Sequence, residues 1–128
     1  MRFMMFMLPN IEAEAGQMPT AEAVAAMSKY NDELTKAGVL LSLDGLHPQI
    51  EGTRVAFSGG KKTVIDGPFT EAKEAIGGYW LIQVKSKEEA IEWAKRVPAV
   101  DDGDFTIEVR QVFDMEEFPP DVQKAAGV

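Results

Sequence analysis

Alternating and helical hydrophobic patterns divide most of the chain into strands and helices. Both alternating faces of residues 3–8 are apolar, which is typical of a central strand covered on both sides. Apolar residues then recur at helical spacing from Thr20, a suitable N-cap, to about Ala37, and Gly38 follows as a stop signal. Residues 39–43 predict a second strand.

A β-hairpin is the clearest local signal that follows. Residues 53–58 and 61–65 read as strands on either side of Gly59-Gly60, a pair that suits a two-residue turn with positive φ. That turn sets the predicted cross-strand neighbours as Val55 with Val64 and Phe57 with Lys62. We expect the hairpin to be an extension added to a smaller repeat.

A corner joins the hairpin to the second half of the chain. Asp66-Gly67-Pro68 must break the preceding strand, because Pro68 fixes its own φ and Gly67 can take a positive φ. A short polar helix is expected next, and Gly77-Gly78 is predicted to end it.

The second half repeats the order of strand, helix and strand. Residues 79–84 form the strand, and Ser86 with Glu89 forms a capping box that opens a helix stopped by Pro98. Residues 105–113 form the last strand. The predicted apolar side of that strand comprises Phe105, Ile107, Val109 and Phe113.

This order, β-α-β, hairpin and β-α-β, predicts an α+β fold, a ferredoxin-like sandwich with the helices on one face of an antiparallel sheet. The other sheet face is also apolar, and each large side chain left exposed there would forgo about 1.5–3 kcal/mol of burial. A second copy of the sheet is the simplest cover, so we predict a two-fold homodimer. One domain is expected over residues 1–113, with a tail over 114–128.

Charge and composition limit the classes of partner that the protein is expected to bind. The 128 residues hold 13 Lys plus Arg against 21 Asp plus Glu, a net charge of −8 that disfavours nucleic acid and anionic membranes. No apolar run approaches the roughly 20 residues of a membrane helix, and there is no Cys. We therefore predict a soluble, cytoplasmic protein that binds no nucleic acid and no membrane. With one His and no Cys, neither a metal site nor a cofactor is expected.

The corner also carries a family resemblance. Asp-Gly-Pro-Phe at 66–69, Glu-Ala-Lys-Glu at 71–74 and Gly-Gly-Tyr at 77–79 are similar to the DGPF-domain branch of the YCII-related proteins, and the similarity extends over about residues 1–113. The resemblance implies a dimeric α-β barrel built from two ferredoxin-like subunits.

The resemblance implies less about activity. DGPF-type proteins are mostly uncharacterised bacterial proteins, often encoded beside extracytoplasmic-function sigma factors. The wider superfamily includes muconolactone-isomerase-like enzymes and a chlorinated-lactone dehalogenase, and a His-Asp pair has been proposed as catalytic in the YCII branch. Here residues 20–37 contain no His and the single imidazole is His47, so that pair has no counterpart in the first helix.

Three residues are candidates for catalysis. Asp66 is a general base if it is partly buried, and Tyr79 or His47 would be the acid. Each has a structural alternative: Asp66 capping its own turn, Tyr79 in the core or an interface, and His47 in an exposed loop.

Five residues are candidates for ligand binding: Arg54, Phe69, Glu71, Lys73 and Arg110. An Arg on a sheet face can grip a carboxylate through two hydrogen bonds, although Arg110 can equally pair with Glu108. Phe69 would either line a ligand pocket or fill the strand–helix corner as a core residue. Glu71 and Lys73 would either place their charged groups at the mouth of a pocket or lie on a solvent-exposed helix.

Three function hypotheses stay open, only the first of which makes the protein an enzyme. The first is a small-molecule site near residues 66–69 in each subunit, where an isomerase or lyase acts by general acid–base chemistry on a small carbonyl or lactone. The second is a non-catalytic regulatory or protein-binding homodimer linked to a sigma-factor system. The third is a structural homodimer whose corner only shapes the subunit.

Overall fold

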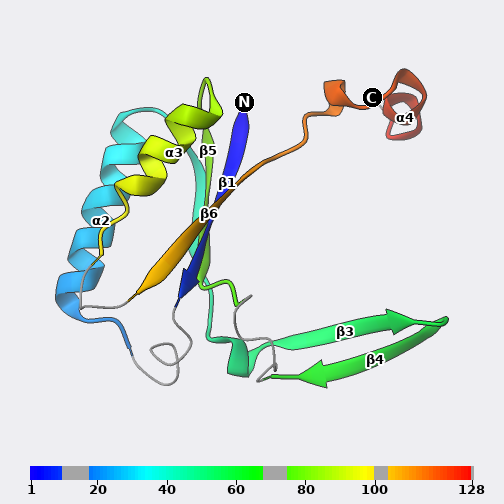
Figure 1. Cartoon of the computed structure of the whole chain (residues 1–128), viewed down its shortest axis with the longest axis horizontal. Helices are drawn as coiled ribbons and strands as arrows, with labels where there is room; N and C mark the ends of the chain where they lie inside the picture. Colours follow the sequence, from blue (N-terminus) through cyan, green and yellow to red (C-terminus); the bar gives the residue numbers. More distant parts are fainter. Residues whose placement is uncertain (10–17, 68–74, 100–103, 128) are drawn as a thin grey trace.

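The computed structural model describes residues 1–9, 18–67, 75–99 and 104–127. In chain order the elements are β1 (Arg2–Pro9), α2 (Ala21–Lys36), β2 (Leu40–Gly45), η1 (Gln49–Glu51), β3 (Thr53–Ser58), β4 (Lys61–Asp66), β5 (Gly78–Gln83), α3 (Lys87–Lys95), β6 (Phe105–Gln111), η3 (Met115–Glu117) and α4 (Pro120–Ala125). An antiparallel sheet has the strand order β2-β5-β1-β6, and α2 and α3 lie on one of its faces (Figure 1). The predicted ferredoxin-like α+β arrangement is confirmed, with β1 central as expected.

Helix α2 begins and ends where its sequence signals predict. The Thr20 Oγ1 atom accepts a hydrogen bond from the Ala23 amide at 3.1 Å, and Gly38 follows the helix with a φ of 73°. The inward stripe buries Tyr30 and Leu34. The same stripe does not extend to Ala37, which is exposed because it already lies at the C-cap.

Helix α3 opens with a variant of the predicted capping box. The Ser86 Oγ atom accepts from the Glu89 amide at 3.1 Å, as expected. The Glu89 carboxylate reaches one residue further back than predicted and accepts from the Lys85 amide at 3.0 Å. The helix ends at Lys95, before the proline that was expected to stop it.

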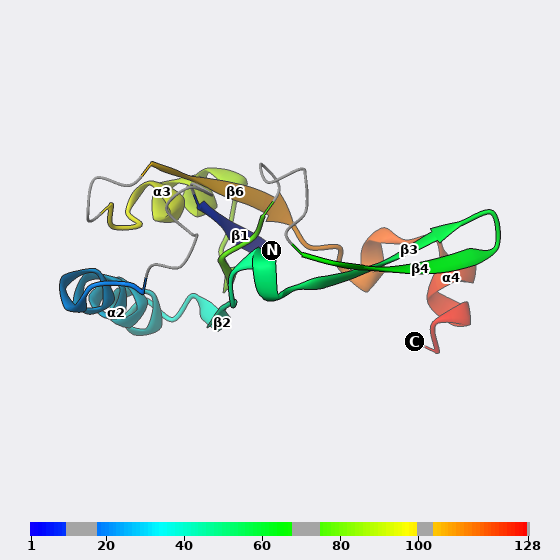
Figure 2. The ribbon, with the colours of Figure 1, turned by 90° about the horizontal axis from the view of Figure 1, so that it is seen from below.

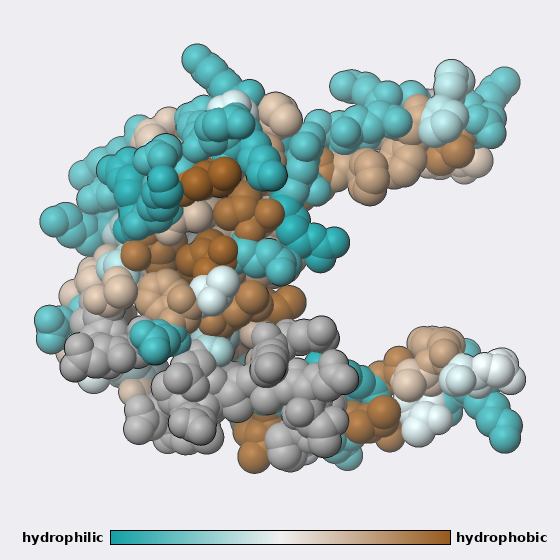
Figure 3. Space-filling model, viewed as in Figure 1, coloured by the Kyte–Doolittle hydropathy of each residue, from teal (hydrophilic) through white to brown (hydrophobic). Residues whose placement is uncertain are grey.

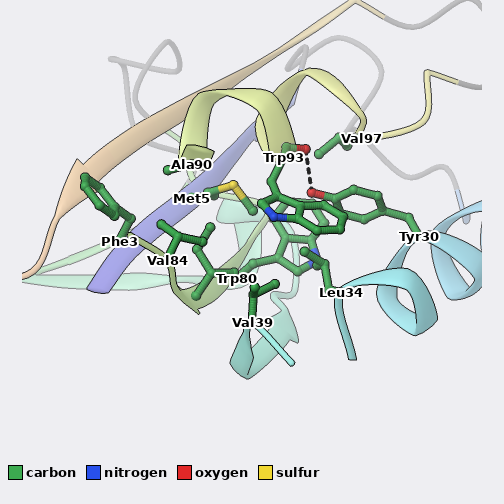
Figure 4. Close-up of a cluster of buried hydrophobic side chains, with 11 residues drawn as sticks. Phe3, Met5, Tyr30, Leu34, Val39, Trp80, Val84, Ala90, Trp93 and Val97 are labelled. Atoms are coloured by element: carbon green, nitrogen blue, oxygen red, sulfur yellow. Dashed lines mark hydrogen bonds between the residues drawn. The ribbon is translucent and has the colours of Figure 1, made fainter. Parts of the chain in front are cut away.

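Aromatic side chains link both helices to the sheet in the core (Figure 4). The rings of Tyr30 and Trp80 meet edge to face with centroids 5.7 Å apart. The Tyr30 hydroxyl donates a buried hydrogen bond of 2.7 Å to the Trp93 carbonyl, which ties α2 to α3. The fully buried side chains around them are Phe3, Met5, Leu34 and Ile82.

The hairpin β3–β4 forms its own two-stranded sheet and projects away from the body on the side opposite the helices (Figures 1 and 2). Gly59 and Gly60 have φ values of 56° and 79°, as the predicted two-residue turn requires. Val55 lies opposite Val64 and Phe57 opposite Lys62, so the predicted register is confirmed. Every residue of both strands is exposed.

The C-terminal residues form a second projection on the same side of the sheet (Figures 1 and 2). Strand β6 ends at Gln111, so the prediction that Phe113 lies on the apolar side of this strand is wrong. Phe113 is 69% exposed and begins an arm that contains η3 and α4. Arg2 fixes the root of this arm, because its guanidinium donates to the Asp114 carboxylate at 3.1 Å.

The sheet face turned away from α2 and α3 is largely apolar. Alternation along the strands places Met4, Phe6 and Leu8 on this face, beside Tyr79 and Leu81. All five are only half-buried, since neither helix covers them. On β6 the same face continues as an exposed polar row of Thr106, Glu108 and Arg110.

Candidate functional site

A cavity of about 260 Å³ lies between α2 and the ends of β2 and β5. Gly45 and Gly78 are cross-strand neighbours in its lining, so no side chain from this pair enters the layer between sheet and helix. The rest of its lining is mainly apolar side chains: Met7, Met27, Leu43 and Trp80. We call it the glycine cavity.

The glycines also hold the strands together at this point. The Gly77 amide donates to the Met7 carbonyl at 2.7 Å, and the Gly77 carbonyl accepts from the Leu46 amide at 2.9 Å. A Cβ atom on Gly78 would lie 2.9 Å from the Asp44 carbonyl oxygen, which is too close for any side chain. The short helix that Gly77-Gly78 was predicted to end falls mostly on residues 68–74, outside the described ranges. In the structure these glycines bring the ends of β1, β2 and β5 together.

Asn31 on α2 supplies an oriented polar group to the glycine cavity. Its Oδ1 atom accepts a hydrogen bond of 2.8 Å from the Trp80 indole N–H. Because an indole only donates, this bond fixes the orientation of the amide and leaves the Asn31 NH₂ group as the available donor. The cavity therefore combines apolar walls with one oriented amide, a combination common in small-ligand sites.

Residues 1–116 match the YCII-related domain. The chain belongs to the YCII-related family. It is also 31% identical over 84 residues to an uncharacterised protein of Rhizobium meliloti (strain 1021), an alignment that covers 66% of this chain and 68% of the relative. Family membership thus agrees with the fold, and this relative carries no assigned activity.

Tyr79 is the predicted catalytic residue that this YCII-related domain places beside the glycine cavity. Its hydroxyl donates to the Asp44 carboxylate at 3.1 Å, across the pairing of β5 with β2. Both residues line the cavity edge. The strand alternation, however, directs their side chains to the open sheet face, opposite Trp80.

His47 and Arg54 both line a second hollow at the root of the hairpin, with a volume of about 480 Å³. The His47 Nδ1 atom lies 3.1 Å from the Glu51 carboxylate, and the His47 side chain is 87% exposed. We call this hollow the root pocket; Thr53 also contributes to its wall.

Asp66 lies at the end of β4 and is exposed. Its carboxylate accepts a hydrogen bond of 3.0 Å from the Thr53 hydroxyl, which closes the base of the hairpin. The neighbouring Gly67 does not use the positive φ that glycine allows. Glycine is needed there for another reason: a Cβ atom would overlap the backbone carbonyl of Gln49.

The remaining candidates lie apart or outside the described residues. Arg110 is exposed on β6, opposite Met4 and on the far side of β1 from Tyr79. Phe69, Glu71 and Lys73 belong to residues 68–74, which lie outside the described ranges. The structure therefore groups His47 with Arg54 and separates both from Tyr79.

Sequence reasoning missed Asn31, Asp44 and the cavity itself. The predicted second strand stopped at residue 43, before Asp44-Gly45, whereas β2 continues through this pair to Gly45. Within residues 1–9, 18–67, 75–99 and 104–127, His, Asp and Glu do not gather in a group of three that could hold a metal ion. In the same ranges, every helix is too short or too polar to span a membrane.

Proposed function

We propose that this YCII-related protein binds a small, uncharged and mostly apolar molecule in the glycine cavity. The observation that carries the proposal is the paired Gly45 and Gly78, which leave space between α2 and the sheet. At about 260 Å³ the cavity is smaller than pockets for drug-sized ligands, which begin near 300 Å³. Its ligand is correspondingly small.

The polar lining suggests the chemical class. The Asn31 amide can donate to a carbonyl oxygen of the ligand, because its own oxygen is already bonded to Trp80. The net charge of −8 disfavours anions. Small lactones and unsaturated ketones satisfy both conditions.

The motif at residues 66–69 supports assignment to the DGPF branch, which we also propose.

Isomerase or lyase chemistry is the finer form of this proposal. Asp44 replaces Asp66 as the proposed base, because Asp44 is hydrogen-bonded to Tyr79 at the cavity edge, whereas Asp66 is bonded to Thr53. For such chemistry both side chains would have to reach the ligand around the end of β2. Tyr79→Phe would then abolish turnover while leaving binding within about threefold.

A ligand-binding screen tests the main proposal. A panel of small lactones and enones would be titrated into the protein and followed by ligand-observed NMR. Asn31→Asp keeps an oxygen acceptor for the Trp80 indole but removes the amide donors, so we expect at least tenfold weaker binding. Gly45→Leu places a side chain where a Cβ meets no atom within 4 Å, and should block the cavity.

Arg110→Ala is the control, since this exposed residue lies on β6, across β1 from the cavity strands. Binding by the unmodified protein that is unchanged in Gly45→Leu would contradict the assignment of this cavity. Absence of binding by every compound in the panel would contradict the proposed ligand class.

We further propose that the protein is a homodimer in which two open sheet faces pack together. Support comes from the half-buried side chains of Met4, Phe6, Leu8 and Leu81, which neither helix covers. Burial of each against a second sheet would contribute roughly 1.5–3 kcal/mol.

A further inference from the structure

Two arms leave the body on the side of the open sheet face (Figures 1 and 2). The hairpin arm, residues 53–66, leaves one end of the sheet, and the C-terminal arm, residues 112–127, leaves the other. Figure 3 shows apolar surface on both arms as well as at the centre of the molecule. Face-to-face packing of two sheets allows each arm to meet either arm of the second copy.

The hairpin arm has one apolar face. Val55, Phe57 and Val64 share this face through the observed register, and they are 51%, 72% and 67% exposed. An isolated two-stranded hairpin is only marginally stable in water. Such a hairpin gains stability when its apolar face is covered.

The C-terminal arm has a matching apolar cluster. The rings of Phe113 and Phe118 lie 5.1 Å apart, and Phe113, Met115 and Val122 are all exposed. Helix α4 has six residues, which is too short to be stable without packing. Both arms therefore present apolar surface that a partner would cover.

The charges of the two arms are opposite. The hairpin arm has three cations, Arg54, Lys61 and Lys62, against Asp66, a net charge of +2. The C-terminal arm has a net charge of −3, because Lys124 is set against four anions: Asp114, Glu116, Glu117 and Asp121. Each arm repels a copy of itself and attracts the other kind.

Two symmetric arrangements would place a second open sheet against the first. A two-fold axis along the strands would bring each arm against its own counterpart, since the arms leave opposite ends of the sheet (Figure 1). A two-fold axis across the strands would bring each hairpin arm against the partner's C-terminal arm. The charges favour the second arrangement, which also joins one apolar cluster to the other.

We propose that, in the homodimer, the hairpin arm of one copy packs along the C-terminal arm of the other, in two equivalent contacts. This inference rests on the proposed dimer. It adds the direction of the two-fold axis and gives both arms a binding role.

Charge reversal on each arm tests the pairing. The first variant carries Lys61→Glu and Lys62→Glu, which change the hairpin arm from +2 to −2, and the second carries Glu116→Lys and Asp121→Lys. All four residues are exposed, so the fold should be unaffected. Dimer dissociation constants would be measured by analytical ultracentrifugation at low ionic strength, where exposed charges are least screened.

We expect each variant alone to dimerise at least tenfold more weakly than the unmodified protein. An equimolar mixture should recover heterodimers of nearly the original affinity, because both arm contacts then join opposite charges. Lys85→Glu with Lys87→Glu is the matched control, since it changes the net charge equally at exposed positions at the start of α3.

The outcomes separate this inference from the dimer on which it rests. If the unmodified protein is a monomer, both are overturned. If it is a dimer and the hairpin-arm variant dimerises as tightly, only the arm pairing is overturned, because arms that meet their own counterparts repel equally at +2 and −2.

Discussion

Tyr30 connects the two helices through a single buried hydroxyl, which donates to the Trp93 carbonyl. Burial raises the pKa of the Tyr30 hydroxyl above its ordinary value of about 10. A pKa that is higher in the folded state than in the unfolded state contributes stability below the unfolded pKa. That contribution is lost as the pH rises above about 10.

Tyr30→Phe should therefore lower the free energy of unfolding by about 1–2 kcal/mol at pH 8, where it removes a buried hydrogen bond. The difference from the unmodified protein should shrink as the pH rises from 9 to 11, since only the unmodified protein has this hydroxyl to ionise. Urea unfolding followed by circular dichroism at several pH values measures both effects. A difference that stays constant over this range would contradict the assignment.

Gly67 offers a second test at the level of a single residue. In Gly67→Ala the new methyl group would overlap the Gln49 carbonyl, and we expect a loss of about 1–3 kcal/mol of stability. Gly45→Ala is the matched control, because a Cβ atom there meets nothing within 4 Å. Equal unfolding midpoints in urea for the two variants would show that the corner can relax without cost.

Gly67 also shows the limit of sequence reasoning about one residue. The need for glycine was predictable from the Gly-Pro corner, but its cause was not. The positive φ that glycine allows is a local property, whereas the observed cause is a contact with Gln49, eighteen positions earlier in the chain. Asn31 escaped notice for a similar reason, because its partner Trp80 is on another element.

Elements were the most predictable level of the structure. The N-caps at Thr20 and Ser86 and the register across Gly59-Gly60 follow from local rules of turns and helix ends. The glycine cavity did not follow from them, because it depends on Gly45 meeting Gly78 across two strands that are distant in sequence.

The hairpin should be removable as a unit. The Gly67 amide donates to the Gly52 carbonyl at 2.9 Å across the base of the hairpin. A bond of the same kind, from the amide of the fourth residue to the carbonyl of the first, closes a β-turn. Replacing residues 53–66 with Asn-Gly would retain this bond. We expect near-native circular dichroism and an unfolding free energy within about 1 kcal/mol of that of the unmodified protein, because the main sheet forms without the hairpin strands. Both proteins would be measured at concentrations below the dimer dissociation constant.

A scrambled version of the hairpin, with the same composition and an intact Gly59-Gly60 turn, serves as the comparison. Collapse of the far-ultraviolet spectrum in the deletion variant would mean that β3 and β4 are needed to fold the main sheet.

Assembly belongs to the scale of the whole molecule. Leu81→Lys would place a charge in the middle of the open sheet face, beside Met4. If two such faces pack together, this variant should be monomeric at micromolar concentration, since a buried unpaired charge opposes the contact. Light scattering coupled to size exclusion measures the mass.

Val24→Lys is the control for that experiment, because Val24 is an exposed apolar residue on α2, on the other side of the sheet. A dimer that survives Leu81→Lys but not Val24→Lys would move the interface to the helices.

The apolar second face was predictable from strand alternation, whereas the projecting arms were not, because the chain carries no local signal for the direction in which a hairpin leaves a sheet.

The hydrogen bond between Trp80 and Asn31 gives this molecule a built-in spectroscopic probe. The chain has two tryptophans, and of these Trp80 is in the described lining of the glycine cavity. Its indole N–H points at the amide that a ligand would approach. In a ¹⁵N-correlated NMR spectrum, a cavity ligand should therefore shift the Trp80 indole resonance more than that of Trp93, so occupancy can be followed without labelling either partner with a dye.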